Sequence, residues 1–165
     1  MMGIRCAVLA LSLILSGVAF SAERSGWEVK VEVNPLYPGV RVFTFTLESS
    51  EGESASGQRV LLEIQVSRQN TMIYTHWQEA LPGTSFDLEM KAGDRPPVRT
   101  GWSLQSNRMT AAFVGRNRMA VLMDLLESDT VSLATYMGAP KPLRAVFTVK
   151  GLARAAGPYM DELGW

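Results

Sequence analysis

Apolar and polar residues alternate one by one over most of the chain after residue 26. Consecutive side chains of a β-strand point to opposite faces, so this alternation gives each strand one buried face and one face in water. Such strands are typical of antiparallel sheets, whereas strands of parallel sheets read as continuous apolar runs. The alternating segments are WEVKVEV (27–33), FTFTLE (43–48), RVLLEIQV (59–66), SFDLEMK (85–91), VRTGWSL (98–104), MTAAF (109–113), TVSLATY (130–136) and LRAVFTV (143–149). Val33, Val98 and Met109 are among the residues that this pattern places on the buried face.

We therefore predict a mainly β protein, with an antiparallel β-sandwich or partly closed barrel of about 8-9 strands. Turn-forming residues separate the strands, and the polar segment 49–57 in particular predicts a hairpin tip. The separators are 34–40, 49–57, 81–85, 92–97 and 138–142. None is long enough to link two domains, so residues 22–165 are predicted to form a single β-rich domain.

Two segments in the C-terminal half have helical spacing instead. In 116–128, Met119, Leu122, Met123 and Leu126 follow an i, i+3, i+4, i+7 pattern, which predicts the buried face of a short helix. In 151–165, a second helical stripe predicts a helix that docks on the sheets. Its members are Leu152, Ala155, Ala156, Tyr159 and Leu163, and Pro158 between them predicts a kink or a new short turn.

The N-terminus has the features of a secretory signal peptide. Arg5 precedes an apolar run from Cys6 to Phe20, which at about 15 residues is too short to span a bilayer. Cleavage after Ser21 puts small residues at the two positions that require them, whereas cleavage after Ala22 puts Phe20 at one of them. We therefore predict a signal peptide over 1–21 and a periplasmic protein, with an uncleaved N-terminal anchor as the alternative.

Charge and cysteine content limit the kinds of partner and chemistry. The chain has 16 Lys and Arg against 16 Asp and Glu, and loss of Arg5 with the leader leaves a net charge of −1. Such a balance gives no field to attract nucleic acid, so we predict no nucleic-acid partner. Cys6 is the only cysteine, and it lies before the apolar run, so neither lipidation nor a disulfide is expected. After cleavage, no stable membrane insertion is expected.

The sequence shows no set of residues that identifies a catalytic, cofactor-binding or metal site. His76 is the single histidine and has no nucleophile motif beside it, so we expect it to face solvent or a polar neighbour. One histidine without a remaining cysteine argues against structural zinc. A pair of carboxylates that meet only in the fold, as in glycosidases, stays open. We predict no enzyme activity and no cofactor.

Four charged residues are the candidates for binding a partner. Arg116 and Arg118 lie near the start of the predicted helix, where the helix dipole disfavours cations and where an acidic partner is able to dock. Asp94 and Arg95 lie in the loop 92–97. The alternative is that these side chains only point into solvent.

The order of the motifs resembles the periplasmic family associated with type VI secretion that is called TagO or VasI. The resemblance covers nearly all of 27–165. It begins with a tryptophan-led strand at Trp27, continues with an N-x-T stretch before Trp77 and a tryptophan–serine pair at Trp102, and ends with Gly164 and Trp165. The matching segments are WEVKVEVNPLYPGVRVFTFTLES (27–49), LLEIQVSRQNTMIYTHW (61–77), FDLEMKAGDRPPVRTGWSLQS (86–106), AAFVGRNRMAVLMDLLESDTVSLATY (111–136) and AVFTVKGLARAAGPYMDELGW (145–165).

The chain departs from this family at its two cysteine positions, which are Val66 and Leu163 here. If those cysteines pair in the relatives, the resemblance implies that Val66 and Leu163 lie in side-chain contact without a covalent bond. It also implies that Trp165 packs against the domain. The residues taken as the family's structural motif are thus Val66, Leu163, Trp77, Trp102, Gly164 and Trp165.

The resemblance implies a non-enzymatic accessory or binding protein of a type VI secretion system or a related envelope machine, with protein partners in the cell envelope. A second hypothesis, based on the small exported β domain and the segment 49–57, is a periplasmic inhibitor or immunity-like protein that acts on a cell-wall hydrolase. A wall hydrolase with paired carboxylates is the third.

Overall fold

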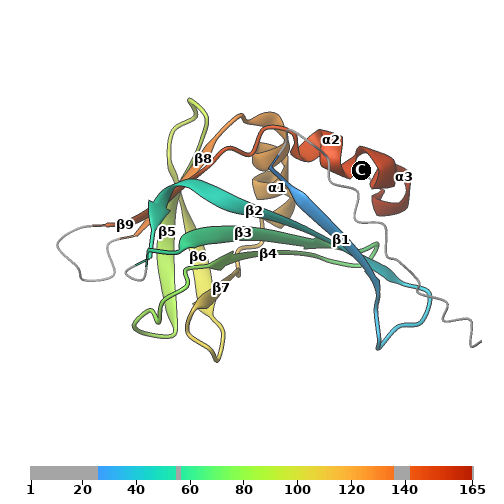
Figure 1. The fold of residues 1–165 in the computed structure, drawn as a ribbon, viewed down its shortest axis with the longest axis horizontal. Helices are drawn as coiled ribbons and strands as arrows, with labels where there is room; N and C mark the ends of the chain where they lie inside the picture. The colour runs from blue at the N-terminus through green and yellow to red at the C-terminus, as the bar shows by residue number, and fades with distance from the viewer. Residues whose placement is uncertain (1–25, 55–56, 136–141, 165) are drawn as a thin grey trace, which may run out of the picture.

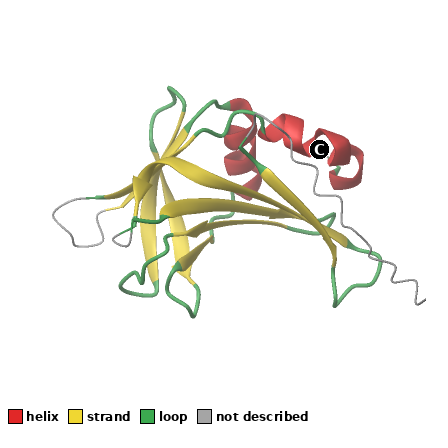
Figure 2. Cartoon of the chain, viewed as in Figure 1, coloured by secondary structure: helices red, strands yellow, loops and turns green. Residues whose placement is uncertain are grey.

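Nine antiparallel strands and a group of helices make up the part of the chain that the computed structural model describes, residues 26–54, 57–135 and 142–164 (Figures 1 and 2). The strands are β1 (Glu28–Val33), β2 (Arg41–Glu53), β3 (Arg59–Val66), β4 (Thr71–His76), β5 (Ser85–Ala92), β6 (Val98–Leu104), β7 (Thr110–Phe113), β8 (Val131–Thr135) and β9 (Leu143–Phe147). The helices are α1 (Arg118–Glu127), α2 (Leu152–Ala156), the single 3-10 turn η1 (Gly157–Tyr159) and α3 (Met160–Leu163).

The strands lie in the order β1-β2-β3-β4-β7-β6-β5-β8-β9, and β9 returns to pair with β2. Eight strands, β2 to β9, therefore close an antiparallel barrel, while β1 is an additional strand on the outside of β2. The mainly β prediction is confirmed, and the barrel is the form that the chain adopts.

The long strand β2 makes this closure possible. Its first half pairs with β1, and its end reaches β9 through Glu51 and Val146. The prediction of a hairpin tip over 49–57 is therefore wrong for 49–53, which belong to the strand. The serines there satisfy backbone groups at an irregularity in the ladder, since the Ser49 hydroxyl bonds with Gly52 O and Val60 N and the Ser50 hydroxyl with Val146 O.

Gly52 is essential to the seam between β2 and β9. Its φ is +87°, and a Cβ added there lies 2.1 Å from the carbonyl oxygen of Arg144 and 2.9 Å from Ala145 Cα. We expect Gly52→Ala to lower the free energy of unfolding by about 2 kcal/mol, because it adds a left-handed strain to a backbone clash. Denaturant unfolding measures the change, and Gly57→Ala (φ +75°, with nothing within 4 Å) isolates the cost of the φ alone. Equal losses from both variants would contradict the clash.

Large apolar side chains fill the interior of the barrel. The largest of the fully buried ones are Trp77, Trp102, Phe43, Phe45 and Phe147. Each of the two tryptophans donates its indole N–H to a threonine hydroxyl two residues earlier on the same strand face, Trp77 to Thr75 at 3.0 Å and Trp102 to Thr100 at 2.9 Å. The buried indole groups are thereby satisfied within a single strand.

Three residues predicted to face inward are exposed. Val33, Val98 and Met109 have 63%, 49% and 41% of their surface in solvent. The first is the last residue of β1, the second is the first residue of β6, and the third precedes β7. Alternation gives the face of a side chain, but at a strand end no neighbouring element covers that face.

The helix α1 is where predicted, but its buried face is different. Val121, Leu122 and Leu125 are buried, whereas Met119 and Met123 are about half exposed, so their prediction as core residues is wrong. Two stripes of apolar residues run along this helix, and both have helical spacing. The barrel selects one of them.

The C-terminal helices lie beside α1 against one end of the barrel (Figure 1). Leu152, Ala155, Ala156 and Leu163 are buried and Tyr159 is half-buried against the core, as the sequence predicts. Pro158 starts the η1 turn between α2 and α3, which confirms the second turn expected there. The predicted signal peptide and Trp165 lie outside the described residues, so their predictions stand untested. Within the described residues, no helix is long and apolar enough to cross a membrane.

Candidate functional site

The turn between β3 and β4, Ser67–Asn70, is the centre of the candidate site. The Ser67 hydroxyl accepts hydrogen bonds from the backbone N–H groups of Gln69 (3.3 Å) and Asn70 (3.2 Å), and Ser67 N donates to Asn70 O at 2.9 Å. A serine that bonds to the two following N–H groups fixes a tight turn. The turn therefore presents the side chains of Arg68 and Gln69, both exposed, at a fixed place.

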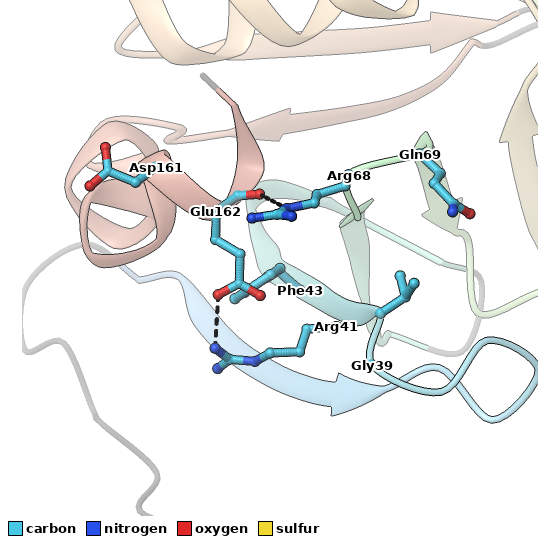
Figure 3. A pocket seen from close by; sticks show the side chains of 8 residues that line it. Gly39, Arg41, Phe43, Arg68, Gln69, Asp161 and Glu162 are labelled. Atoms are coloured by element: carbon cyan, nitrogen blue, oxygen red, sulfur yellow. Dashed lines mark hydrogen bonds and ion pairs between the residues drawn. The ribbon is translucent and has the colours of Figure 1, made fainter.

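A hollow of about 640 Å³ lies between this turn, the start of β2 and α3 (Figure 3). Three segments that are distant in the sequence therefore meet at one end of the barrel. The residues that line the hollow are Gly39, Val40, Arg41, Phe43, Arg68, Gln69, Asp161 and Glu162. We call this hollow the turn site.

Glu162 connects the two arginines of the turn site. Its carboxylate pairs with Arg41 Nη1 at 2.8 Å, and its backbone oxygen accepts a hydrogen bond from Arg68 Nε at 3.3 Å (Figure 3). The Arg41 guanidinium also lies over the Phe43 ring, 5.1 Å from its centroid, as a cation–π pair. These contacts attach the four-residue helix α3 to β2 and to the β3–β4 turn.

Arg68 is the group in the turn site with the greatest capacity for a ligand. Its Nε is used by Glu162, and among the described residues its two Nη groups have no hydrogen-bond partner. An arginine presents donors in a planar fork that suits a carboxylate. The side chain is held at one atom while its outer donors stay available, so the site is suited to bind a carboxylate-bearing ligand.

Two smaller hollows adjoin the same turn. One, of about 330 Å³, lies between the turn, the start of α1 and the end of α3; the other, of about 230 Å³, lies between the turn and the β1–β2 loop that contains Tyr37. Arg118 lines the first of them and donates to Asn70 Oδ1 at 3.3 Å, while its Nε is buried without a hydrogen-bond partner. Gln69 lines all three hollows.

The structure separates the four predicted partner-binding residues into two places. Arg118 borders the β3–β4 turn, and Arg116 is exposed just before α1. Asp94 and Arg95 lie between β5 and β6, and Arg95 pairs with Asp124 and with Glu127 (2.6 Å) on the later part of α1. Six residues of helix from Arg118 to Asp124 span roughly 9 Å, so the two places lie along one helix.

Sequence reasoning missed Arg41, Arg68, Gln69 and Glu162. The polar stretch SRQN between two alternating segments indicated an exposed turn with an arginine in it. Nothing in the sequence indicated that α3 lies beside that turn, because the contact joins residues 94 positions apart.

The residues taken as the family motif are mostly core residues. Val66, Leu163, Trp77 and Trp102 are buried and belong to one hydrophobic cluster, while Gly164 is exposed with a φ of +74°. Leu163 lines the hollow that Ser67 also lines, directly after Val66. A direct contact between Val66 and Leu163 stays a prediction.

His76 belongs to a polar network on the outer face of β3, β4 and β7. Its Nε2 lies 3.1 Å from Glu63 Oε2 and its Nδ1 lies 3.1 Å from Thr110 Oγ1. Gln65 donates to the other Glu63 oxygen at 2.8 Å, and Asn107 donates to Thr110 Oγ1 at 2.9 Å. These hydrogen bonds join neighbouring strands, which assigns the network a role in stability.

The same network shifts two pKa values. The hydrogen bond from His76 holds the pKa of Glu63 below its usual value, although partial burial opposes it. Burial raises the pKa of the neighbouring Tyr74, and the charge of Glu63 raises it further. Ionised Glu63 therefore stabilises the fold above about pH 4.5, and this stabilisation is lost as the pH falls through the lower, folded-state pKa.

We expect Glu63→Gln to lower the free energy of unfolding by about 1–2 kcal/mol at pH 7, because a hydrogen bond to a charged group is lost. Near pH 3 the carboxyl is protonated in both the folded and the unfolded wild type, so the difference is expected to shrink to a few tenths of that energy. Urea unfolding at both pH values measures it. A deficit that is the same at both pH values would contradict an ionic role for Glu63.

Within the described residues, no group of three or more His, Cys, Asp or Glu side chains is arranged to hold a metal ion. Comparisons with protein-family models, with curated proteins and with solved structures find no match for this chain.

Proposed function

We propose that the protein is a non-enzymatic periplasmic binding protein that serves a type VI secretion system or a related envelope machine. The signal-like N-terminus supports export, and the order of the tryptophan motifs supports the TagO or VasI relationship. The binding role rests on one observation of the fold, the open hollow of the turn site with the partly unoccupied guanidinium of Arg68.

The chemistry of the turn site fits a protein partner. Its wall combines an aromatic ring, two arginines, an amide and two carboxylates. Such a mixed surface matches the polar rim and aromatic contacts of transient protein interfaces. Leu36 and Tyr37, 80% and 57% exposed, lie on the adjoining β1–β2 loop and add apolar contact area. We propose that the partner places a carboxylate on Arg68 and an apolar side chain near this loop.

The loop itself is held in shape. Asn34 N and Val40 O form a 2.7 Å hydrogen bond across it, and the Asn34 side chain accepts from Leu36 N at 2.9 Å. A loop that is ordered before binding loses less conformational entropy in a complex. Its apolar tip is thus ready to contact a partner.

Affinity capture from envelope extracts tests this proposal. We expect the double variant Arg68→Ala/Gln69→Ala to recover at least about tenfold less partner than the wild type, because it removes the carboxylate contact at a fixed turn. Its thermal melting is expected to stay unchanged, since both side chains are exposed. Mass spectrometry identifies the captured protein, and secretion-machine components would support the family relationship.

A matched double variant at the other place along α1 is the control. Asp94→Ala/Arg95→Ala removes exposed charges of the same kind, and we expect it to retain the partner. Loss of the partner in this variant alone would move the site to the β5–β6 turn and contradict the turn site.

The inhibitor or immunity-like alternative has less support from the structure. It relied on 49–57 as a projecting loop, and residues 49–53 are part of β2. Capture of a cell-wall hydrolase, with inhibition of its activity by the purified protein, is the result that would favour it.

A further inference from the structure

β1 has an edge without a neighbouring strand. It pairs with β2 in an unbroken register, from Glu28 opposite Thr46 to Val33 opposite Arg41. Within the described ranges, no other strand pairs with it, and no backbone hydrogen bond links 28–33 to any segment except β2. A strand edge of this kind carries a row of unpaired N–H and C=O groups, which is a template for another strand.

The usual protections of a sheet edge are missing from β1. Its six residues contain no proline, and its register contains no bulge. The face toward the helices carries only valines, of which Val29 and Val31 are partly buried and Val33 is exposed. The edge is therefore regular enough to accept a second strand.

The other face of β1 carries charges that alternate in sign, Glu28, Lys30 and Glu32. Lys30 and Glu32 form an ion pair at 2.8 Å, yet their side chains are 69% and 58% exposed, so both keep room for further partners. A row of like charges repels a copy of itself, whereas an alternating row is able to match a reversed copy.

We propose that this edge binds a second copy of the chain, with two β1 strands paired antiparallel about a two-fold axis at Val31. In this register Lys30 lies opposite Glu32 of the second copy, and Glu32 lies opposite Lys30 of the second copy. The valines of the two strands meet on the opposite face. The strand thus provides both the backbone groups and the matching charges.

The charges also decide between registers. A pairing centred on Lys30 places two lysines opposite each other and sets Glu28 against Glu32, which is unfavourable. A pairing centred on Val29 matches Lys30 with Glu28 and leaves Glu32 outside the charge pairs. The register centred on Val31 keeps more of β1 paired, because residues 29–33 all lie opposite one another.

The expected dimer is weak. A pair of six-residue strands buries far less than the roughly 1,600 Å² of a standard stable interface. We therefore expect an equilibrium between monomer and dimer that shifts with protein concentration. A second copy is favoured over an unrelated strand because the charge pattern is complementary to itself. The inference does not depend on the turn site.

Sedimentation velocity over a concentration series tests the proposal on the protein expressed from its full sequence. We expect Lys30→Glu and Glu32→Lys each to weaken the dimer about tenfold, because each change turns two attractive pairs into repulsive ones. Mixing the two variants in equal amounts is expected to restore a dimer, since each glutamate then faces a lysine. Glu28→Lys on the same strand is the matched control and is expected to dimerise like the wild type. Circular dichroism verifies that every variant is folded.

A wild type that stays monomeric throughout the series overturns the proposal. A dimer that neither Lys30→Glu nor Glu32→Lys weakens also overturns it, because the interface then lies elsewhere. A dimer weakened by Glu28→Lys but not by Glu32→Lys overturns the register centred on Val31.

Discussion

Trp102→Ala is expected to lower the free energy of unfolding by about 3–5 kcal/mol. Trp102 is 1% exposed, and its ring meets the Phe113 ring edge-on with 5.6 Å between centroids. Its removal leaves a large cavity between β6 and β7 and also removes a buried hydrogen bond to Thr100. Chemical unfolding followed by far-UV circular dichroism measures the loss, because the substitution also changes the fluorescence.

Thr100→Val separates the two contributions to this loss. It keeps the shape of the side chain but leaves the Trp102 indole N–H without its partner, so we expect a cost of about 1–3 kcal/mol. Trp102→Ala must cost more than Thr100→Val if packing dominates. A loss below about 1 kcal/mol for Trp102→Ala would mean that the barrel interior rearranges around the gap.

The double variant Val66→Cys/Leu163→Cys is expected to form a disulfide in an oxidising compartment and to stabilise the fold by about 3 kcal/mol. The bridge would close a loop of about 97 residues, for which the loss of chain entropy in the unfolded state is large. Both positions lie in the same core cluster, and Tyr159 packs 4.8 Å from Phe43, which is opposite Val66 in the sheet.

Unfolding with and without a reductant measures this gain, in a background with Cys6→Ser so that no other thiol takes part. The two single variants are the controls, and each is expected to be slightly less stable than the wild type. Failure of the cysteines to pair would show that Val66 and Leu163 are not neighbours, and the TagO or VasI relationship would lose its most specific structural support.

Local patterns predicted most of the fold because they report local physics. A strand such as β3 reads correctly from RVLLEIQV, since one face of it is buried along its whole length. The predicted turn at Pro158 is also present, because a missing N–H affects only its own neighbourhood. Predictions failed where a side chain's surroundings came from elsewhere in the chain. Met119 and Met123 lie on an apolar stripe, but Val121, Leu122 and Leu125 are the residues that the barrel covers.

The segment 49–53 shows a different cause of error. Its composition, rich in serine and glutamate, is typical of an exposed tip. In the fold its serine hydroxyls bond to backbone groups beside β9, so polar residues complete the seam of the barrel. Composition describes solubility well, but a strand whose neighbours are backbone groups has no need of apolar side chains.

The candidate site could be predicted only in part. Arg118 was found from its place at the start of a helix, and it does border the β3–β4 turn. Arg41, Arg68 and Glu162 become one site only when α3 packs against β2, and no local pattern contains that contact.

The sequence alone determined the class of this protein: an antiparallel β domain with helices near its end, because strand and helix periods are written into the spacing of apolar residues. Only the tertiary structure decided that the sheet closes through β2 and β9, that Glu162 holds two arginines beside one turn, and that β1 keeps an open edge. Each of these depends on contacts between distant segments, which are set by the packing of the whole chain and not by the order of neighbouring residues.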